Sequence, residues 1–270
     1  MKDLTRDLEA RAPYEFTDLD VAKSAWADFR AQHGLSRVAV PLLTAPDGNA
    51  KYEKTLKGGY AAVYGLALLP ADGSGFNVCR FSTPECRAAC VAYAGHGDLD
   101  TVKRARYVRT LFLAEYTSEF LTLLMHEIRA AWHKHGSALR VRLNSFSDLR
   151  WERICPEIFS TFTAVRFYDY TKWPVTQRAF EGMPPNYHLT QSVSERTRDS
   201  TIADYAWAGV NQAVVFRVER DEPLPTTWRG VRVIDGDKSD NRGDDPRGVI
   251  VGLRAKGRMR KGEWKMARTA

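Results

Sequence analysis

The sequence lacks any apolar run long enough to cross a membrane. Its longest apolar stretches, 61–69 and 121–125, are far shorter than the ~20 residues that a spanning helix needs. The first nine residues alternate acidic and basic side chains and have no apolar core of the secretory type. We therefore expect a protein of the cytoplasm, where structural disulfides are rare.

The sequence also lacks the short motifs of several large enzyme classes. It has no glycine-rich Walker loop and no nucleophile elbow. Paired histidines of the kind found in replication-initiator nucleases are missing too, since His133 and His135 alternate without a supporting pattern of carboxylates. No internal repeat is visible. These absences disfavour a P-loop nucleotidase, a serine hydrolase and a metal-dependent nicking enzyme.

The chain is basic and large enough to form a full core. It has 270 residues, of which 44% are hydrophobic and 27% charged, which suits one large α/β domain or two small ones. The formal charge is +7 and the sequence pI is about 9.2, with basic clusters at 103–109 and 254–265. Such a balance favours a polyanionic partner, although solvated basic faces give the same composition.

The pattern of apolar residues predicts a mixed α/β fold. Helical spacing marks 17–33, which ends at Gly34, and 98–135 with a break near 115–117. The segment from Arg87 onward also looks helical. Short β-prone runs lie at 60–70, 139–143, 164–168, 187–190, 212–218, 231–234 and 248–253. Several are separated by helix-length polar segments, as in parallel sheets. We expect a single-domain partial or irregular (β/α) barrel at 45–256, an N-terminal helical segment at 1–44 and a basic C-terminal tail at 257–270.

Three cysteines lie within twelve residues, with the spacing Cys79-x6-Cys86-x3-Cys90. They occupy a turn-rich loop after a predicted buried strand, where three thiols can converge on zinc or an iron–sulfur cluster. Three protein ligands would leave one coordination position open for chemistry. The alternative is that they are unrelated core thiols, which is our expectation for Cys155.

Polar residues follow four successive predicted strands. Because the carboxyl ends of parallel strands meet at one edge, these residues predict a site there. Asp148, Asp169 and Asp237 are the candidate acid, base or orienting groups. The alternative is that such residues cap helices. The candidate pocket residues are Asn144, Ser147, Tyr170, Lys172, Ser192, Asp235 and Lys238.

The chain resembles a phage and plasmid family of three-cysteine-motif proteins, some of which are described as replication initiators. The resemblance rests on Asn77-Val-Cys79, Tyr93-Ala-Gly95, Arg142-Leu-Asn144, Phe167-Tyr-Asp169-Tyr-Thr-Lys172, Asn186-Tyr-His-Leu-Thr190, Val231-x-Val-Ile-Asp-Gly-Asp237 and Gly248-Val-Ile-Val-Gly252. That family is in turn distantly similar to radical S-adenosylmethionine enzymes. The resemblance implies a 4Fe-4S cluster on Cys79, Cys86 and Cys90 with S-adenosylmethionine at the open iron, and a host-cell cytoplasmic location.

These observations lead to one leading hypothesis and three alternatives. The leading hypothesis is an enzyme that modifies a DNA or RNA base, DNA being preferred, at an iron–sulfur or zinc centre. A weaker similarity, to tRNA-guanine transglycosylases, implies deazaguanine insertion into DNA with Asp148, Asp169 or Asp235 as the nucleophile. The others are a replication initiator that uses Tyr168 or Tyr170 to nick DNA, and a non-catalytic binding module with structural zinc.

Overall fold

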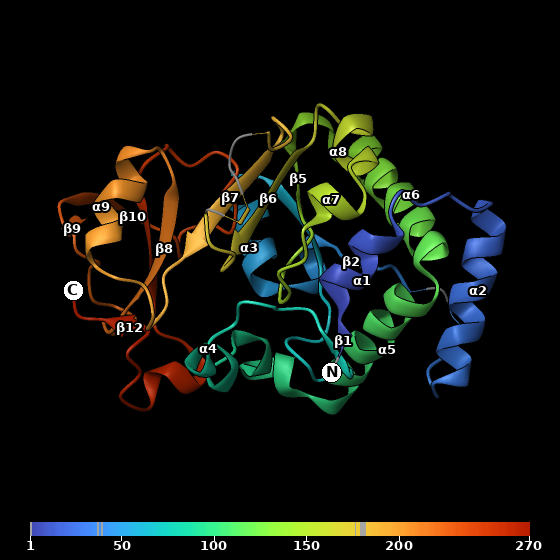
Figure 1. The fold of residues 1–270 in the computed structure, drawn as a ribbon, viewed down its shortest axis with the longest axis horizontal. Helices are drawn as coiled ribbons and strands as arrows, with labels where there is room; N and C mark the ends of the chain where they lie inside the picture. Colours follow the sequence, from blue (N-terminus) through green and yellow to red (C-terminus); the bar gives the residue numbers. More distant parts are fainter. Residues whose placement is uncertain (1, 37, 39, 176, 179–181) are drawn as a thin grey trace.

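A mostly parallel β-sheet forms the centre of the computed structural model, which describes residues 2–36, 38, 40–175, 177–178 and 182–270 (Figure 1). Neighbouring strands pair in parallel from β3 to β10, while β2 and β9 pair antiparallel at the two ends. The strand order is β2 (Leu43–Thr44), β3 (Ala62–Leu66), β5 (Leu139–Arg142), β6 (Arg166–Thr171), β7 (Tyr187–Ser192), β8 (Asn211–Phe216), β11 (Ile250–Arg254), β10 (Val231–Asp235) and β9 (Thr227–Trp228). The fold is therefore mixed α/β, as the sequence predicts.

The two longest helices lie in the connection from β3 to β5, and a helix of the N-terminal segment packs against them. The break predicted near 115–117 is confirmed, because α5 ends at Glu115 and α6 begins at Thr117. The helices are α1 (Leu4–Arg11), α2 (Leu19–Gln32), α3 (Ala50–Lys57), α4 (Pro84–Ala88), α5 (Asp100–Glu115), α6 (Thr117–His135), α7 (Trp151–Ile154), α8 (Glu157–Thr161) and α9 (Ser200–Trp207). A separate pair of short strands joins β1 (Lys2–Asp3) to β4 (Phe76–Asn77).

The predicted N-terminal amphipathic helix is α2. The Asp18 side chain caps it by accepting from the backbone N–H groups of Asp20 (2.8 Å) and Val21 (3.2 Å). Its apolar face buries Trp26 and Phe29, whose rings lie 4.8 and 5.4 Å from that of Phe112 on α5. Burial of such large aromatic surfaces is the main source of stability at this contact.

The structure corrects the bounds of two predicted elements. The strand expected at 164–168 is β6, which continues to Thr171, so Asp169 lies inside the strand and pairs with Leu189 of β7. The helix expected from Arg87 onward begins earlier, at Pro84, and ends at Ala88. The N-cap at Thr83 explains its start, and 3₁₀ turns replace the helix after Cys90.

The C-terminal residues, predicted as a basic tail, are folded onto the sheet. Strand β12 (Ala267–Arg268) pairs with Val215 and Phe216 of β8, beyond the point where β7 stops pairing with β8 at Ala213. Met259 and Met266 are buried against Ala89 of the cysteine segment. The sequence predicted a tail because 257–270 is mostly basic. Burial of the two methionines holds the segment in place.

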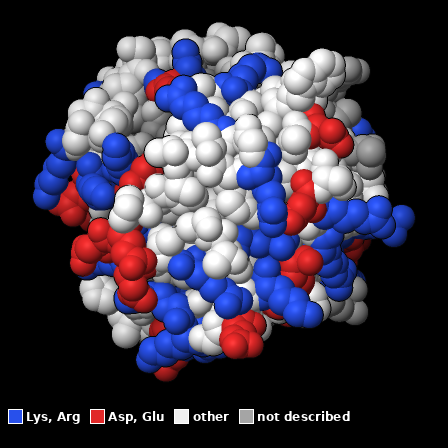
Figure 2. All heavy atoms as spheres, turned by 90° about the vertical axis from the view of Figure 1, so that its left-hand side faces the viewer, with Lys and Arg blue, Asp and Glu red and all other residues white. Residues whose placement is uncertain are grey.

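No helix in the described part of the chain is long and apolar enough to span a lipid bilayer. The face formed by the C-terminal strands carries bands of Lys and Arg side chains with acidic groups between them (Figure 2).

Candidate functional site

A cavity of about 380 Å³ lies at the carboxyl ends of the parallel strands. Its lining comes from the cysteine segment after β3, from the ends of β5, β6, β7 and β11, and from residues of β8. The C-terminal Met259 and Met266 form part of its apolar wall. The predicted site residues that line it are Cys79, Cys86, Cys90, Asn144, Ser147, Asp148, Tyr170, Lys172 and Ser192.

Short hydrogen bonds hold the cysteine segment against the end of the sheet. The Asn77 side chain accepts from the backbone N–H of Cys79 (2.9 Å). Thr83 caps α4 by accepting from the N–H of Cys86 (3.3 Å), and its hydroxyl donates to Glu195 after β7 (2.7 Å). Glu195 therefore ties the helix that carries Cys86 to a different strand.

The three thiols are free and partly buried. The Cys79 thiol donates to the backbone carbonyl of Phe146 (3.4 Å). Burial raises the pKa of the Cys79 and Cys90 thiols, so both are neutral at pH 7 without a bound cation. Cys155 is 1% exposed within the main hydrophobic cluster, which confirms it as a core thiol.

The donor chemistry at the cavity fits a soft metal or cluster, whereas the side-chain positions are not yet those of a formed site. Three thiols from one segment line one wall, which is the donor set that zinc or iron–sulfur clusters take. Across the residues that the structure describes, no three His, Cys, Asp or Glu side chains are arranged to hold a metal ion. Binding would therefore require Cys79 to leave Phe146 and the thiols to turn toward one another.

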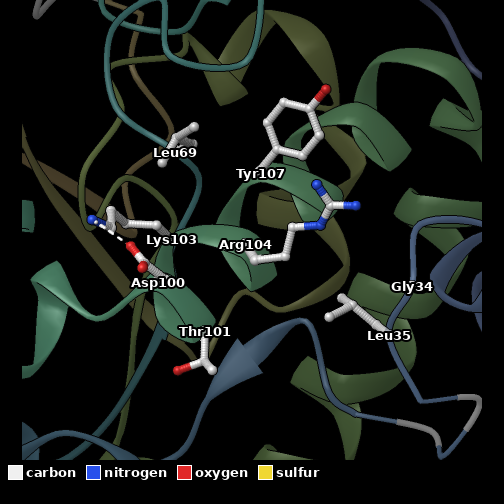
Figure 3. Close-up of a pocket in the computed structure, with 8 residues that line it drawn as sticks. All are labelled: Gly34, Leu35, Leu69, Asp100, Thr101, Lys103, Arg104 and Tyr107. Carbon is white, nitrogen blue, oxygen red and sulfur yellow. Dashed lines mark ion pairs between the residues drawn. The ribbon is translucent and has the colours of Figure 1, made fainter.

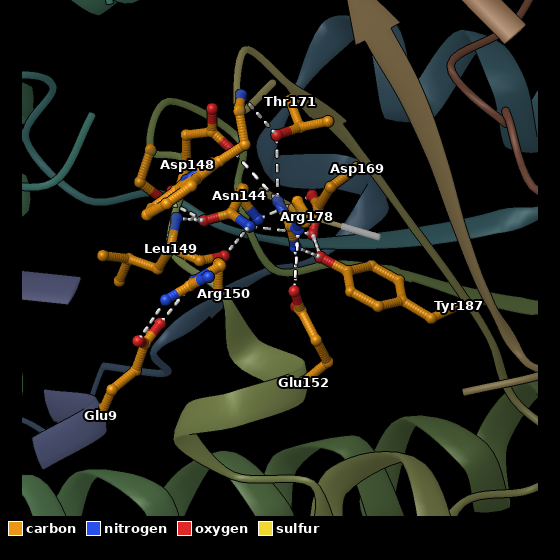
Figure 4. Close-up of polar contacts among 12 residues, drawn as sticks. Glu9, Asn144, Asp148, Leu149, Arg150, Glu152, Asp169, Thr171, Arg178 and Tyr187 are labelled. Atoms are coloured by element: carbon orange, nitrogen blue, oxygen red, sulfur yellow. Dashed lines mark hydrogen bonds and ion pairs between the residues drawn. The ribbon is translucent and has the colours of Figure 1, made fainter. Parts of the chain in front are cut away.

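Asp148 joins the cysteine segment to the end of β6. Its backbone N–H donates to the carbonyl of Val78 (2.8 Å), directly before Cys79. Its carboxylate accepts from the N–H of Lys172 (2.7 Å) and pairs with the buried guanidinium of Arg178 (3.1 Å), as Figure 4 shows for the Arg178 contact. Burial raises the pKa of the Asp148 carboxyl against the opposing effect of Arg178. The side chain is at the cavity and already has two strong partners.

Asp169, predicted on the rim, lies instead behind Asn144. It is fully buried and accepts from the backbone N–H of Asn144 (2.7 Å), the Asn144 amide (3.2 Å) and the Tyr187 hydroxyl (2.8 Å) (Figure 4). Asn144 in turn accepts from the Ser147 hydroxyl (2.8 Å). Asp169 does not line the cavity, so its role there is to position Asn144 and Ser147.

Replacing Asp169 with asparagine should change how stability depends on pH. Burial raises the pKa of its carboxyl to about 7, so the stability from its protonated form is complete below about pH 4 and is lost as the pH rises through 7. The asparagine side chain cannot titrate. Between pH 4 and 7 the slope of unfolding free energy against pH should therefore become more positive by up to about 1.4 kcal/mol per unit. Urea denaturation at several pH values measures this, and equal slopes would contradict the shifted pKa.

A buried charge cluster, not predicted from the sequence, lies on the cavity wall. Asp240 is fully buried and contacts Lys51 (2.9 Å), Arg142 (3.3 Å) and the Tyr168 hydroxyl (2.9 Å). Burial opposes its ionisation, but the two cations outweigh this and lower its pKa to about 2. The sequence offered one signal for this cluster. The Arg142-x-Asn144 spacing places two polar side chains at the end of β5, and Arg142 is a member of the cluster.

Tyr170 has an unsatisfied hydroxyl at this wall. The oxygen is buried and has no hydrogen-bond partner among the described residues. The guanidinium of Arg142 lies 4.9 Å from the centre of its ring. A buried unpaired hydroxyl is costly, so this group is a candidate contact for a bound molecule.

Three further predicted residues lie outside the cavity, in a neighbouring groove. Asp235, Asp237 and Lys238 line this groove, whose volume is about 510 Å³. Asp237 pairs with Lys256 (2.6 Å) and Arg254 (3.4 Å). Burial opposes ionisation of Asp237, but these contacts lower its pKa overall. Asp237 is thus an ion-pair partner at the cavity mouth.

Another hollow, of about 630 Å³, lies between the end of α2 and the start of α5 (Figure 3). Its charged Lys103 and Asp100 pair with each other (2.9 Å), and Arg104 donates to the carbonyl of His33 (2.7 Å). None of the predicted site residues lines it.

Comparisons with known proteins give one match. A family model described as gene product 88 matches residues 41–269, which include the three cysteines, all strands of the sheet and β12. No curated protein and no solved structure matches the chain.

Proposed function

As the chain belongs to the gene product 88 family, which is of phage type, we propose that it modifies a nucleic-acid base at a three-cysteine iron–sulfur centre of the radical S-adenosylmethionine kind. The observation that carries this proposal is the presence of Cys79, Cys86 and Cys90 on one cavity wall at the carboxyl ends of parallel strands. Zinc on the same thiols is the alternative centre.

The cysteine segment is the part of the chain that would hold the centre. When bound, an iron–sulfur cluster would supply an electron to S-adenosylmethionine. Asp148 and Glu195 hold the segment in place through Val78 and Thr83. We infer that the sheet curves around the cavity as a partial barrel, since residues from β5 to β11 all contribute to the lining.

The polar part of the lining supports binding of an anionic aromatic molecule. Lys51, Arg142 and Lys172 line the cavity, and Tyr170 adds an aromatic ring and an unpaired hydroxyl. Among the described residues, only Asp240 and Asp148 contribute carboxylates to the lining, and both have cationic partners. A nucleotide has the corresponding phosphate charge and base surface.

Three candidate residues of the alternative chemistries receive less support from the geometry. Of the candidate transglycosylase nucleophiles, Asp169 lies behind Asn144, and Asp235 pairs with Arg254 in the neighbouring groove (3.2 Å). The candidate nicking residue Tyr168 is fully buried and donates to Asp240 (2.9 Å).

Metal analysis of protein purified without oxygen tests the centre. We expect iron and acid-labile sulfide in the wild type, and loss of essentially all of both in the Cys79→Ala, Cys86→Ala, Cys90→Ala triple variant. Cys155→Ala is the matched control, since Cys155 is a core thiol distant from the cavity lining. Circular dichroism should report folded protein in all three.

Two outcomes of the analysis would reject the iron–sulfur centre. Iron and sulfide retained by the triple variant would place the centre elsewhere, and zinc without sulfide would replace the cluster by a zinc site. With iron confirmed, cleavage of S-adenosylmethionine and nucleoside mass spectrometry of treated DNA and RNA test the activity. The triple variant should yield neither product.

A further inference from the structure

Two surface hollows adjoin the cavity, one beyond the other. The groove at Asp237 shares Arg254 and Lys256 with the cavity, and it shares Lys54 and Lys238 with a third hollow of about 570 Å³ beside α3. Because neighbouring hollows have lining residues in common, we describe the three together as one depression. It leads from the cysteines to Tyr60 at the outer end.

Positive charge along this depression exceeds the negative charge that could neutralise it. Arg254 forms ion pairs with both Asp235 and Asp237, and Lys256 also pairs with Asp237. Glu53 pairs with Lys57. In the described residues, Arg220 and Lys238 form no ion pair, and Lys54 contacts only the backbone carbonyl of Asp237 (2.9 Å). Three exposed cations are therefore free to bind an external anion.

We define the basic track as Tyr60, Lys54, Lys238, Arg220 and Lys256, in order from the outer end to the cavity mouth. Its members come from four separate chain segments. The fold, rather than one basic stretch of sequence, creates the track.

Tyr60 gives the track an exposed aromatic surface. Its side chain is 54% exposed, and its backbone N–H donates to the carbonyl of Thr55 (3.2 Å). A Cβ on Gly58 would lie 2.8 Å from the Tyr60 ring, so a larger residue there would push the ring aside. Gly59 has φ of +73°, a conformation that glycine adopts readily. Both glycines therefore favour the position of the ring.

We propose that the basic track binds a single strand of nucleic acid, with its phosphates on Lys54, Lys238 and Arg220 and one base stacked on Tyr60. Cations interleaved with aromatic rings are typical of single-strand binding. A base must leave its stack to enter a cavity, which a single strand allows at low cost. The inference rests on the proposed function and specifies its substrate as an oligonucleotide rather than a free nucleotide.

Fluorescence anisotropy with labelled single-stranded and duplex oligonucleotides tests the proposal. The charge variant is Arg220→Ala with Lys238→Ala, because neither residue has an ion pair to lose. Its matched control is Arg153→Ala with Lys134→Ala, which likewise removes one arginine and one lysine from exposed positions, on α7 and α6. Tyr60→Ala tests the stacking surface separately.

We expect single strands to bind more tightly than the duplex. The charge variant should raise Kd roughly tenfold and reduce the slope of log Kd against log salt by about 1.4, as for two lost phosphate contacts. Tyr60→Ala should raise Kd by roughly 5-fold to 100-fold, and the control pair should change Kd far less. Equal losses in the control pair, or equal affinity for the duplex, would overturn the proposal.

Binding can be judged independently of the cysteine centre. The triple cysteine variant should bind the oligonucleotide as tightly as the wild type, because the track contains no cysteine. Suppose that the wild type carries a cluster and modifies a base, but the track variants bind the oligonucleotide normally. This result would refute the proposed role of the track and leave the proposed centre standing. Suppose instead that the wild type contains no iron, but the track variants lose binding. This result would refute the proposed centre and support the role of the track.

Discussion

Replacing Asp240 with asparagine should lower the free energy of unfolding by about 3–5 kcal/mol, the usual cost of leaving buried charges without a partner. Asp240 contacts Lys51 (2.9 Å) and Arg142 (3.3 Å), whose side chains are 31% and 16% exposed. Asparagine keeps the size but removes the negative charge. Two cations would then share a cavity wall without compensation, and the acceptor for the Tyr168 hydroxyl would be weaker.

The difference between wild type and this variant should depend on pH. The Asp240 pKa is lowered to about 2, so its stabilising effect is present above about pH 4 and is lost as the pH falls through 2. Urea denaturation at pH 7 and at low pH measures this loss. Asp20→Asn is the control. The Asp20 side chain is 90% exposed, so its pair with Lys23 contributes under about 1 kcal/mol to the free energy of unfolding. A similar small loss in Asp240→Asn would contradict the predicted role.

Replacing Arg178 with methionine should also cost about 3–5 kcal/mol. Its guanidinium, 1% exposed, lies between Asp148 (3.1 Å) and Glu152 (2.8 Å) and donates to the Tyr187 hydroxyl (3.1 Å). Methionine fills the space of the side-chain stem and removes the charge. Two buried carboxylates would lose their shared cation, and they would regain neutrality only by binding protons.

Chemical denaturation of Arg178→Met and of Arg166→Met measures the free energy of unfolding of each variant. The comparison distinguishes a buried ion pair from an exposed one. Arg166 pairs with Asp244 but is 56% exposed, so its loss should cost under about 1 kcal/mol. Adding Glu152→Gln to Arg178→Met should recover part of the loss, because one unpaired carboxylate is then removed. Equal losses for the two arginine variants would show that the Arg178 contacts contribute little.

The sequence indicated most of the sheet because its signals are local. Each predicted β-prone run corresponds to one of the parallel strands β3, β5, β6, β7, β8, β10 and β11. The alternation of Leu139 and Val141 with Arg140 and Arg142 is such a signal, as buried and partly exposed positions alternate along β5. The end of β6 was placed too early, because Asp169 suits a turn by composition and is held in the strand by Asn144 and Tyr187.

The sequence by itself determined the α/β class, the core role of Cys155 and the grouping of three thiols on one short segment, since all three follow from composition and close spacing. Only the tertiary structure decided which polar side chains share the cavity. It brought Asp240 and Lys51 together across 189 positions of the chain, moved Asp169 behind Asn144 and folded 257–270 over the cavity. Such contacts depend on strand order and on burial of residues far apart in the chain, and no local pattern contains either.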